Sequence, residues 1–426
     1  MTGTHRHQAD FHDEYDGANR LHDPVQPCPG NRRTLRIRYV PAGDGFDVIV
    51  TGVADDSPAG PIAHLAADAD DIRFWVNDLL RAWSTWLIDW PDPDGLDEYP
   101  FADRVDHRDL DPRTLRAMWQ RLAQAGHELF QNLFQGNAAL EALGTAVARA
   151  LHARPQVITV VADEVIVPWP MLYVPADPWA DLPGDFDVDL DTFVGHRHLV
   201  EHAFARHGAN PSSIRLDGRV AAGAYYDTRL HLAANPTLGA AMDALALHTR
   251  LVRTTSADEL TERMRADGAA DHLVYFCCHC VTRPGEELLR FSRDVGDEIS
   301  AGNLGNRLRR KFQRFPLVLL NACQAGKVER VSLRQFGPVL FERGAGAVIG
   351  PVVNIPTVFA GEFARQFFER VLPHRGLLHF STVARELVQG FARDQRNLLA
   401  LTYMLYQGID GHFCRREQDA GPTAGR

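Results

Sequence analysis

The chain has 426 residues, of which 45% are hydrophobic, so it contains enough apolar material for a sizeable core and for two or three domains. Its 45 basic and 55 acidic residues give a formal net charge of −10, which argues against direct nucleic-acid binding. No apolar stretch reaches the roughly 18 residues that span a bilayer, and the polar N-terminus lacks a signal-peptide core, so we expect no membrane partner. The spacing of the six cysteines is poor for a disulfide framework and predicts a cytoplasmic protein.

The first part of the chain is predicted to open with a disordered, histidine-rich tail over residues 1–30, and residues 416–426 are expected to form a second disordered tail. Trp75, Trp83 and Trp86 recur at helical spacing, which we interpret as a core stripe and not as a ligand-stacking surface. The expected elements are a hairpin of Leu35–Val40 and Asp47–Val50, helices over Ile72–Ile88, Pro112–Phe134 and Ala138–His152, and strands over Val157–Val161 and Glu164–Val167.

A stretch rich in Asp, Pro and Gly over residues 175–192 predicts a long surface excursion, after which strands and helices alternate. Such alternation predicts an α/β fold with a largely parallel sheet covered by helices on both faces. The expected strands are Val220–Tyr226, His272–Cys278, Pro316–Asn321 and Gly346–Val352, and the expected helices are Leu238–His248, Ala257–Arg265, Ile299–Phe312, Gln335–Arg343, Val358–Val371 and Phe380–Asp394.

Two of these strands lead into reactive side chains. The first segment is Tyr275–Cys280, which contains His279, and the second is Leu319–Gly326, which contains Cys323. The carboxyl ends of neighbouring parallel strands meet at one sheet edge, and the separation of 44 positions between the two residues leaves room for one helical crossover. An imidazole beside a thiol can take its proton, so the pair predicts a cysteine nucleophile with a histidine base. A small buried cysteine and a core histidine are the structural alternatives.

Other chemistries fit the sequence less well. The run Cys277-Cys278-His279-Cys280 cannot surround one tetrahedral zinc ion, because consecutive strand residues point to opposite faces, so no metal site is predicted. A G-x-S-x-G elbow is missing, which argues against a serine hydrolase. The glycines of Gly344–Gly350 precede a strand instead of following one, which indicates a tight helix-to-strand turn and no nucleotide loop. We expect no cofactor.

The residues around this pair resemble the CHAT domain, a caspase-like cysteine peptidase module related to separase and the clan CD peptidases. The resemblance extends from about Leu35 to Phe413. Besides the histidine and cysteine motifs, it rests on Ser57–Gly60, Val167–Leu172, Phe336–Pro351, Phe363–Phe368 and Leu398–Gly408, the last two of which resemble the closing helices of the family.

The resemblance implies a cysteine endopeptidase with His279 as general base, Cys323 as nucleophile, and the backbone N–H groups of Cys280 and Cys323 as oxyanion donors. Cys280 stands where relatives usually have glycine, and a left-handed backbone there would be harder for cysteine. The resemblance also implies a degenerate pseudo-protease half over residues 31–208, followed by the active caspase-like half over residues 209–415.

The resemblance implies a protein substrate, in relatives a gasdermin-like or other effector of bacterial defence or regulated cell death, and an activating partner protein. Asp227 stands where related enzymes place a substrate-pocket determinant, which would favour a basic residue before the scissile bond; a helix cap or turn residue is the alternative. The second function that we consider is a catalytically silent caspase-like adaptor or scaffold, and Cys280 in place of glycine is the feature that favours it.

Overall fold

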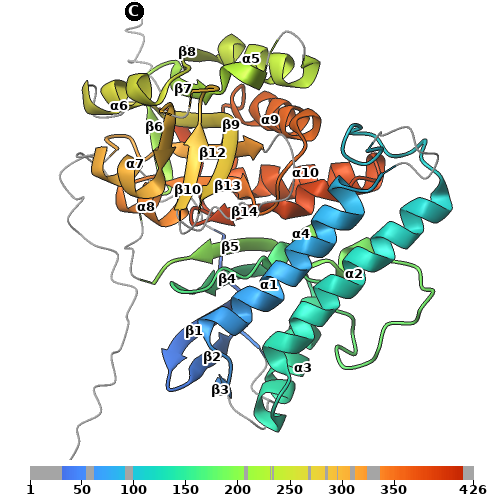
Figure 1. Ribbon diagram of the computed structural model, residues 1–426. Coiled ribbons are helices and arrows are strands. Elements are labelled where there is room, and N and C mark those ends of the chain that lie inside the picture. Colours follow the sequence, from blue (N-terminus) through green and yellow to red (C-terminus); the bar gives the residue numbers. More distant parts are fainter. Residues whose placement is uncertain are drawn as a thin grey trace, which may run out of the picture. The chain divides into compact units, whose positions relative to one another are not determined.

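The computed structural model describes the backbone of most of the chain (Figure 1). The ranges that it describes are 31–53, 62–91, 99–205, 210–230, 232, 235–266, 270–283, 286–294, 296–307, 312–323 and 336–415. Residues Arg32–Arg426 cluster into one compact unit. The predicted tails and the Ser57–Gly60 motif lie outside the described residues.

The described elements are strands and helices in alternation along most of the chain. The strands are β1 (Leu35–Ala42), β2 (Gly45–Thr51), β3 (Ile62–Leu65), β4 (Val157–Val161), β5 (Leu199–Ala203), β6 (Ser213–Leu216), β7 (Val220–Tyr226), β8 (Thr249–Thr254), β9 (Leu273–Arg283), β10 (Glu286–Arg290), β11 (Glu298–Ser300), β12 (Leu317–Cys323), β13 (Ala347–Pro351), β14 (Tyr403–Tyr406) and β15 (His412–Arg415). The α-helices are α1 (Ala69–Trp83), α2 (Pro112–Phe134), α3 (Ala138–Ala153), α4 (Val194–Arg197), α5 (Pro236–His248), α6 (Ala257–Ala266), α7 (Ala301–Arg307), α8 (Phe336–Glu342), α9 (Thr357–Val371) and α10 (Phe380–Asp394). Short helical turns are the π-helix η2 (Ser84–Ile88) and the 3₁₀ turns η3 (Trp169–Met171), η4 (Leu190–Thr192), η5 (Thr228–Leu230) and η6 (Leu399–Thr402).

One large sheet joins strands from both ends of the described chain, in the order β11-β10-β9-β12-β13-β14-β5-β4-β1-β2-β3, with β7 and β8 attached beside β9. Its central pairs β9–β12, β12–β13, β14–β5 and β4–β5 are parallel, β13–β14 among them is antiparallel, and the antiparallel hairpins β1–β2 and β9–β10 flank them. In Figure 1, α6, α7 and α8 lie on one side of β9 and β12, and α9 and α10 lie on the other. The predicted α/β class with a largely parallel sheet is confirmed.

Short polar residues fix the starts of the long helices. Asp68 caps α1 in a capping box with Asp71, Asp111 caps α2 directly before Pro112, and Asn137 caps α3. In each case the side-chain oxygen accepts a hydrogen bond from backbone N–H groups that have no partner inside the helix. Proline suits the first helical position because its missing N–H would be unpaired there in any case.

Most predicted elements form as expected. The first hairpin, α2, α3, β4, β7, α5, α6, β12, α8, β13, α9 and α10 all agree with their predicted ranges within a few residues. Gly344 has a φ of +92° between α8 and β13, which confirms a tight turn from helix to strand at this glycine-rich segment.

Three predictions are wrong. Glu164–Val167 is not a strand: it follows β4 as a buried loop into η3, where Pro168 supplies no backbone donor. Ile299–Phe312 is not one helix, because β11 takes its first residues and only α7 is helical. The segment Leu398–Gly408 is not a closing helix: it forms η6 and then β14, which pairs with β13 and β5.

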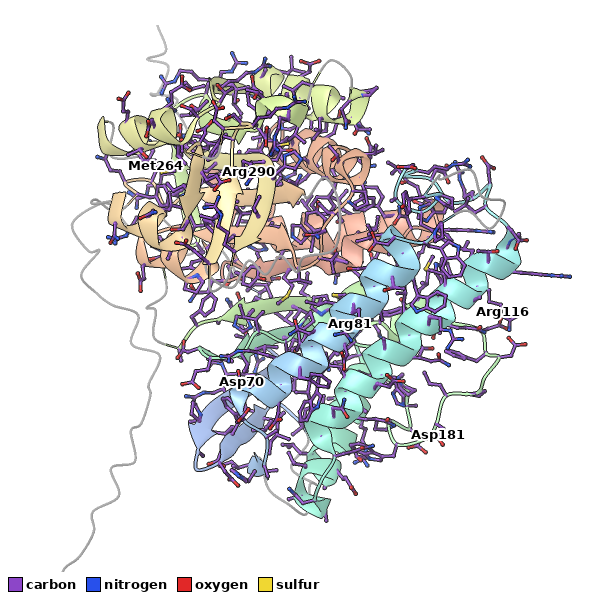
Figure 2. The ribbon with its side chains drawn as sticks, viewed as in Figure 1. Asp70, Arg81, Arg116, Asp181, Met264 and Arg290 are labelled. Atoms are coloured by element: carbon purple, nitrogen blue, oxygen red, sulfur yellow. The ribbon has the colours of Figure 1, made fainter. Side chains whose placement is uncertain are left out.

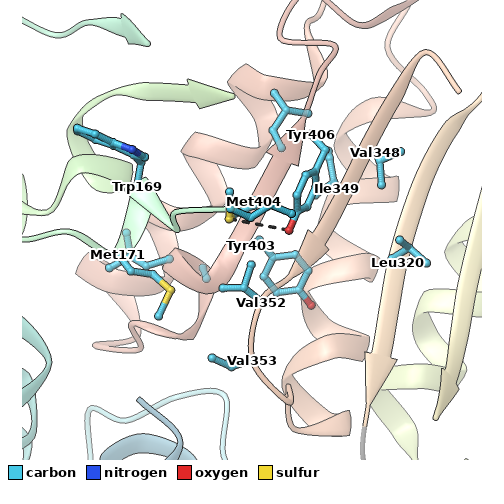
Figure 3. Packing of buried hydrophobic residues seen from close by; sticks show 14 of the residues in the cluster. Trp169, Met171, Leu320, Val348, Ile349, Val352, Val353, Tyr403, Met404 and Tyr406 are labelled. Carbon is cyan, nitrogen blue, oxygen red and sulfur yellow. Dashed lines mark hydrogen bonds between the residues drawn. The ribbon is translucent and has the colours of Figure 1, made fainter. Parts of the chain in front are cut away.

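The core is continuous from β1 to β14. In the view of Figure 3, Met404 of β14 lies between Trp169 and Met171 of η3 on the left and Ile349 of β13 on the right, and all four belong to one buried cluster. Strand β14 pairs with β5, so the sheet crosses the boundary predicted near residue 208 without a break. The division into a pseudo-protease half and an active half therefore stays a prediction.

The aromatic stripe of α1 and η2 is mainly a core feature, as predicted. Trp83 is fully buried, and Trp75 and Trp86 pack against the core. Phe74 is the exception, with 61% of its surface exposed. No helix among the described residues is both long enough and apolar enough to cross a membrane.

Candidate functional site

The candidate site lies where the parallel pairing of β9 and β12 ends. Both strands are continuous apolar runs and fully buried along most of their length, as expected for a central strand covered on both faces. Their register places Asn321 opposite Cys277 and Cys323 opposite His279. Neighbouring strands lie about 4.8 Å apart, so the backbones of Cys323 and His279 lie next to each other across the two strands.

The structure thus brings together the two residues that the sequence singles out, although not quite as expected. Cys323 is the last residue of β12, and its backbone is the part that the structure describes. His279 is not the end of its strand: β9 continues to Arg283 and turns into β10. The connection from β9 to β12 contains β10, β11 and the short helix α7 instead of one long crossover helix.

His279 is held in place by a carboxylate. Its side chain is buried, and Nδ1 lies 2.7 Å from Oδ2 of Asp227. An ionised carboxylate can only accept a hydrogen bond, so Nδ1 carries the proton and donates it to Asp227. The lone pair of the ring then lies on Nε2, the nitrogen that can take a proton from a thiol.

Asp227 is the residue directly after β7, and none of its surface is exposed. Oδ1 accepts hydrogen bonds from the backbone N–H of Arg229 at 2.8 Å and from Arg229 Nε at 3.0 Å, while the terminal guanidinium nitrogen of Arg229 bonds Oδ2. Burial raises the pKa of Asp227, but the hydrogen bonds from His279 and Arg229 outweigh burial and hold that pKa well below its usual range. The structure therefore places Asp227 against His279 and Arg229.

Cys280 keeps an ordinary strand backbone. Among the described residues, positive φ values outside glycine occur only at Phe315, Arg396 and Gln407, so Cys280 does not adopt the left-handed conformation that cysteine would resist. It pairs with Leu289 of β10, and its side chain is fully buried. Adjacent strand residues point to opposite faces, so the Cys280 thiol lies across the sheet from the His279 ring.

A second buried carboxylate lies nearby and was not predicted. The side chain of Glu298 in β11 accepts a hydrogen bond from Arg283 at 2.6 Å and from Arg290 Nε at 2.5 Å. Arg290 is the register partner of His279 across the β9–β10 hairpin, and Figure 2 shows its place in this part of the sheet. Nothing in the sequence distinguishes Glu298 from other acidic residues, because its role depends on the hairpin that carries it.

The side chain of Asn321 supports the strand that ends at Cys323. It is fully buried, and Nδ2 donates to the carbonyl oxygen of Ala360 at 2.8 Å, while Oδ1 accepts from the Tyr403 hydroxyl at 2.8 Å. These bonds tie β12 to α9 and β14. Within the described part of the chain, no group of three or more His, Cys, Asp or Glu side chains could hold a metal ion.

A family model described as the CHAT domain matches residues 228–396, which confirms the resemblance over this part of the chain. The match contains His279 and Cys323. A search of the curated proteins finds no match.

A comparison with solved structures finds matches at low identity. The Saccharomyces cerevisiae separase–securin complex at 2.6 Å resolution has a TM-score of 0.44 and 9% identity, covering 90% of this chain and 30% of the separase chain. The same complex at 3.0 Å has a TM-score of 0.43 and 9% identity, covering 88% and 29%. A structure described as a protease has a TM-score of 0.37 and 10% identity, covering 68% of each chain. The chain thus spans less than a third of the length of the separase chain.

Proposed function

We propose that the CHAT domain formed by residues 228–396 is a cysteine endopeptidase, with Cys323 as its nucleophile and His279 as its general base. The single observation that carries the proposal is the register of the sheet, which sets Cys323 opposite His279 at the end of two parallel strands. The hydrogen bond from Nδ1 to Asp227 supports it, because that bond leaves Nε2 as the basic nitrogen of the ring.

In the proposed reaction, His279 Nε2 takes the proton of the Cys323 thiol, and the thiolate attacks the carbonyl carbon of a peptide bond. The backbone N–H groups of Cys323 and Cys280 are the proposed donors to the oxyanion. His279 then gives its proton to the leaving amine, and the acyl group remains on sulfur as a thioester. Water, deprotonated by His279, attacks the thioester and releases the carboxylic acid, which restores the thiol.

The proposed substrate is a specific protein partner in a bacterial defence or regulated cell-death system, of the gasdermin-like kind cleaved by relatives of this family. We further propose an activating partner protein and a cytoplasmic location. These proposals rest on the resemblance to the CHAT family. The net charge of −10 supports a protein substrate over direct contact with nucleic acid.

A catalytically silent adaptor is the second candidate. It is favoured by Cys280, which stands where relatives usually have glycine and lies within the paired β9–β10 hairpin. The adaptor and the peptidase differ in one measurable property, the reactivity of the Cys323 thiol.

That reactivity is measured by pulse labelling with iodoacetamide at pH 7, with each cysteine quantified by mass spectrometry. Cys414, which is partly exposed, serves as the internal reference, and Cys277 and Cys278 are buried controls. An ordinary thiol with a pKa of about 8.5 is only a few per cent ionised at pH 7, so an assisted Cys323 should react about tenfold faster than Cys414. His279→Ala should remove that advantage. Equal rates for Cys323 and Cys414 in both proteins would support the adaptor instead.

A further inference from the structure

Both oxygens of the Asp227 carboxylate, and its backbone N–H, have hydrogen-bond partners. Its two oxygens accept hydrogen bonds from His279 Nδ1, from Arg229 Nε and from the Arg229 backbone N–H. Its own backbone N–H donates to the carbonyl oxygen of Cys277 at 3.0 Å, which fixes the start of the loop after β7 to β9. The carboxylate is fully buried, while the Arg229 side chain keeps 24% of its surface exposed.

Burying a carboxylate is costly unless a counter-charge and hydrogen bonds compensate for the lost water. Arg229 supplies both the charge and a planar pair of donors, so Asp227 remains ionised without needing a proton from the imidazole. Arg229 donates hydrogen bonds to both oxygens of Asp227, so the carboxylate stays ionised. Oδ2, which faces Nδ1 of His279, can therefore only accept a hydrogen bond.

We propose that Asp227, held by Arg229, is a positioning residue that fixes the tautomer and the ring orientation of His279. This inference rests on the proposed cysteine–histidine pair and deepens it. It also assigns Asp227 a different role from that of a substrate-pocket determinant. A carboxylate that already binds a guanidinium and an imidazole has little capacity left for a basic substrate side chain.

The asparagine variant gives a distinctive test. In Asp227→Asn, the amide oxygen is expected at the Oδ1 position, because the backbone N–H of Arg229 that donates there cannot move away, whereas the guanidinium that bonds Oδ2 ends a flexible, partly exposed side chain. The amide NH₂ group then faces His279, and it can only donate. Nδ1 must therefore become the acceptor and the proton must move to Nε2, which would deprive the ring of its basic atom toward the thiol. The variant is expected to invert the tautomer of His279.

The tautomer is read from the imidazole ¹⁵N shifts of histidine-labelled protein, with the His279 signals identified by their loss in His279→Ala. Wild type should show a protonated Nδ1, and Asp227→Asn should show a protonated Nε2. The rate of Cys323 alkylation by iodoacetamide should fall about tenfold in Asp227→Asn and Asp227→Ala, to the rate of an unassisted thiol. Iodoacetamide carries no amino-acid side chain, so loss of a substrate pocket would not slow it.

Asp271→Asn is the matched control. Asp271 is also buried and also paired with an arginine, Arg263, at 2.7 Å, but it lies before β9 at the opposite end from His279. Its variant should lower stability while leaving the His279 shifts and the Cys323 rate unchanged.

The outcomes distinguish a failure of the positioning role of Asp227 from a failure of the peptidase proposal. A fast Cys323 in wild type, with wild-type shifts and rates in both Asp227 variants, would overturn the positioning role and leave the peptidase proposal standing. A slow Cys323 in wild type would overturn the peptidase proposal and this inference with it. If the variants fail to fold, the wild-type spectrum still decides, since a protonated Nε2 there contradicts the assignment.

Discussion

The buried amide of Asn321 offers a quantitative test of how β12 is held. Asn321→Ala would remove the two short hydrogen bonds to Ala360 and Tyr403 and leave a small cavity. A buried partner that loses its hydrogen bond costs about 1–3 kcal/mol, so two such bonds give about 2–6 kcal/mol. This is a large share of the roughly 5–15 kcal/mol by which domains are stable.

Urea denaturation followed by tryptophan fluorescence gives the free energies of unfolding. Tyr403→Phe removes only one of the two bonds, so it should cost about 1–3 kcal/mol, about half as much as Asn321→Ala. The double variant should fall short of the sum by about 1 kcal/mol, because both single variants remove the same bond. Asn303→Ala, at an exposed position of α7, is the control and should change stability by less than about 0.5 kcal/mol.

Two results would contradict this role of Asn321. One is an Asn321→Ala protein as stable as the Asn303→Ala control. The other is strict additivity of Asn321→Ala and Tyr403→Phe, which would mean that the bond between them carries no energy.

Three further predictions follow from the fold. His202 is buried and its pKa is lowered from 6.5 to about 4 by burial, so the unfolded chain binds the proton first and stability should fall as the pH drops from 6.5 toward 4. That contribution amounts to about 3 kcal/mol, so between pH 7 and pH 4 the free energy of unfolding in urea should fall by about 3 kcal/mol less in His202→Phe than in wild type. Gly361→Ala places a Cβ 2.6 Å from the backbone of α5, so it should lower the melting temperature by the equivalent of about 1–3 kcal/mol, whereas Gly302→Ala, with open space around it, should not. Where β5 meets β14, the carboxylate of Glu201 accepts hydrogen bonds from Arg33, Thr159 and the backbone N–H of Ile409. Glu201→Ala should therefore lower the melting temperature by a similar amount. An unchanged melting temperature would show that the carboxylate does not hold this junction.

The sequence predicts the pairing of His279 with Cys323 because each follows a long apolar run, and such runs become central parallel strands. The same rule fails for Glu164–Val167, which is apolar but finds no strand to pair with. It also misses β8 and β14, which are recognisable only from their neighbours. Whether a short segment becomes a strand is decided by what lies beside it.

The bond between His279 and Asp227 could not be predicted from spacing either. The two residues are 52 positions apart, and their contact depends on the register of β7 against β9. The nearby Arg229 gives a partial signal, since an acid and an arginine two residues apart at a strand end often pair. That signal fits a turn or a substrate pocket equally well. Only the hydrogen bond between the carboxylate and His279 in the structure distinguishes these roles from the positioning of the imidazole.

The central claim is that the chain cuts peptide bonds through Cys323. The most direct measurement compares all protein N-termini in cells that express wild type, Cys323→Ala or His279→Ala. We expect new N-termini with wild type alone, and the residues preceding them would define the cleavage preference. The proposal would be contradicted if all three samples showed the same N-termini although Cys323 of the wild type reacts rapidly with iodoacetamide.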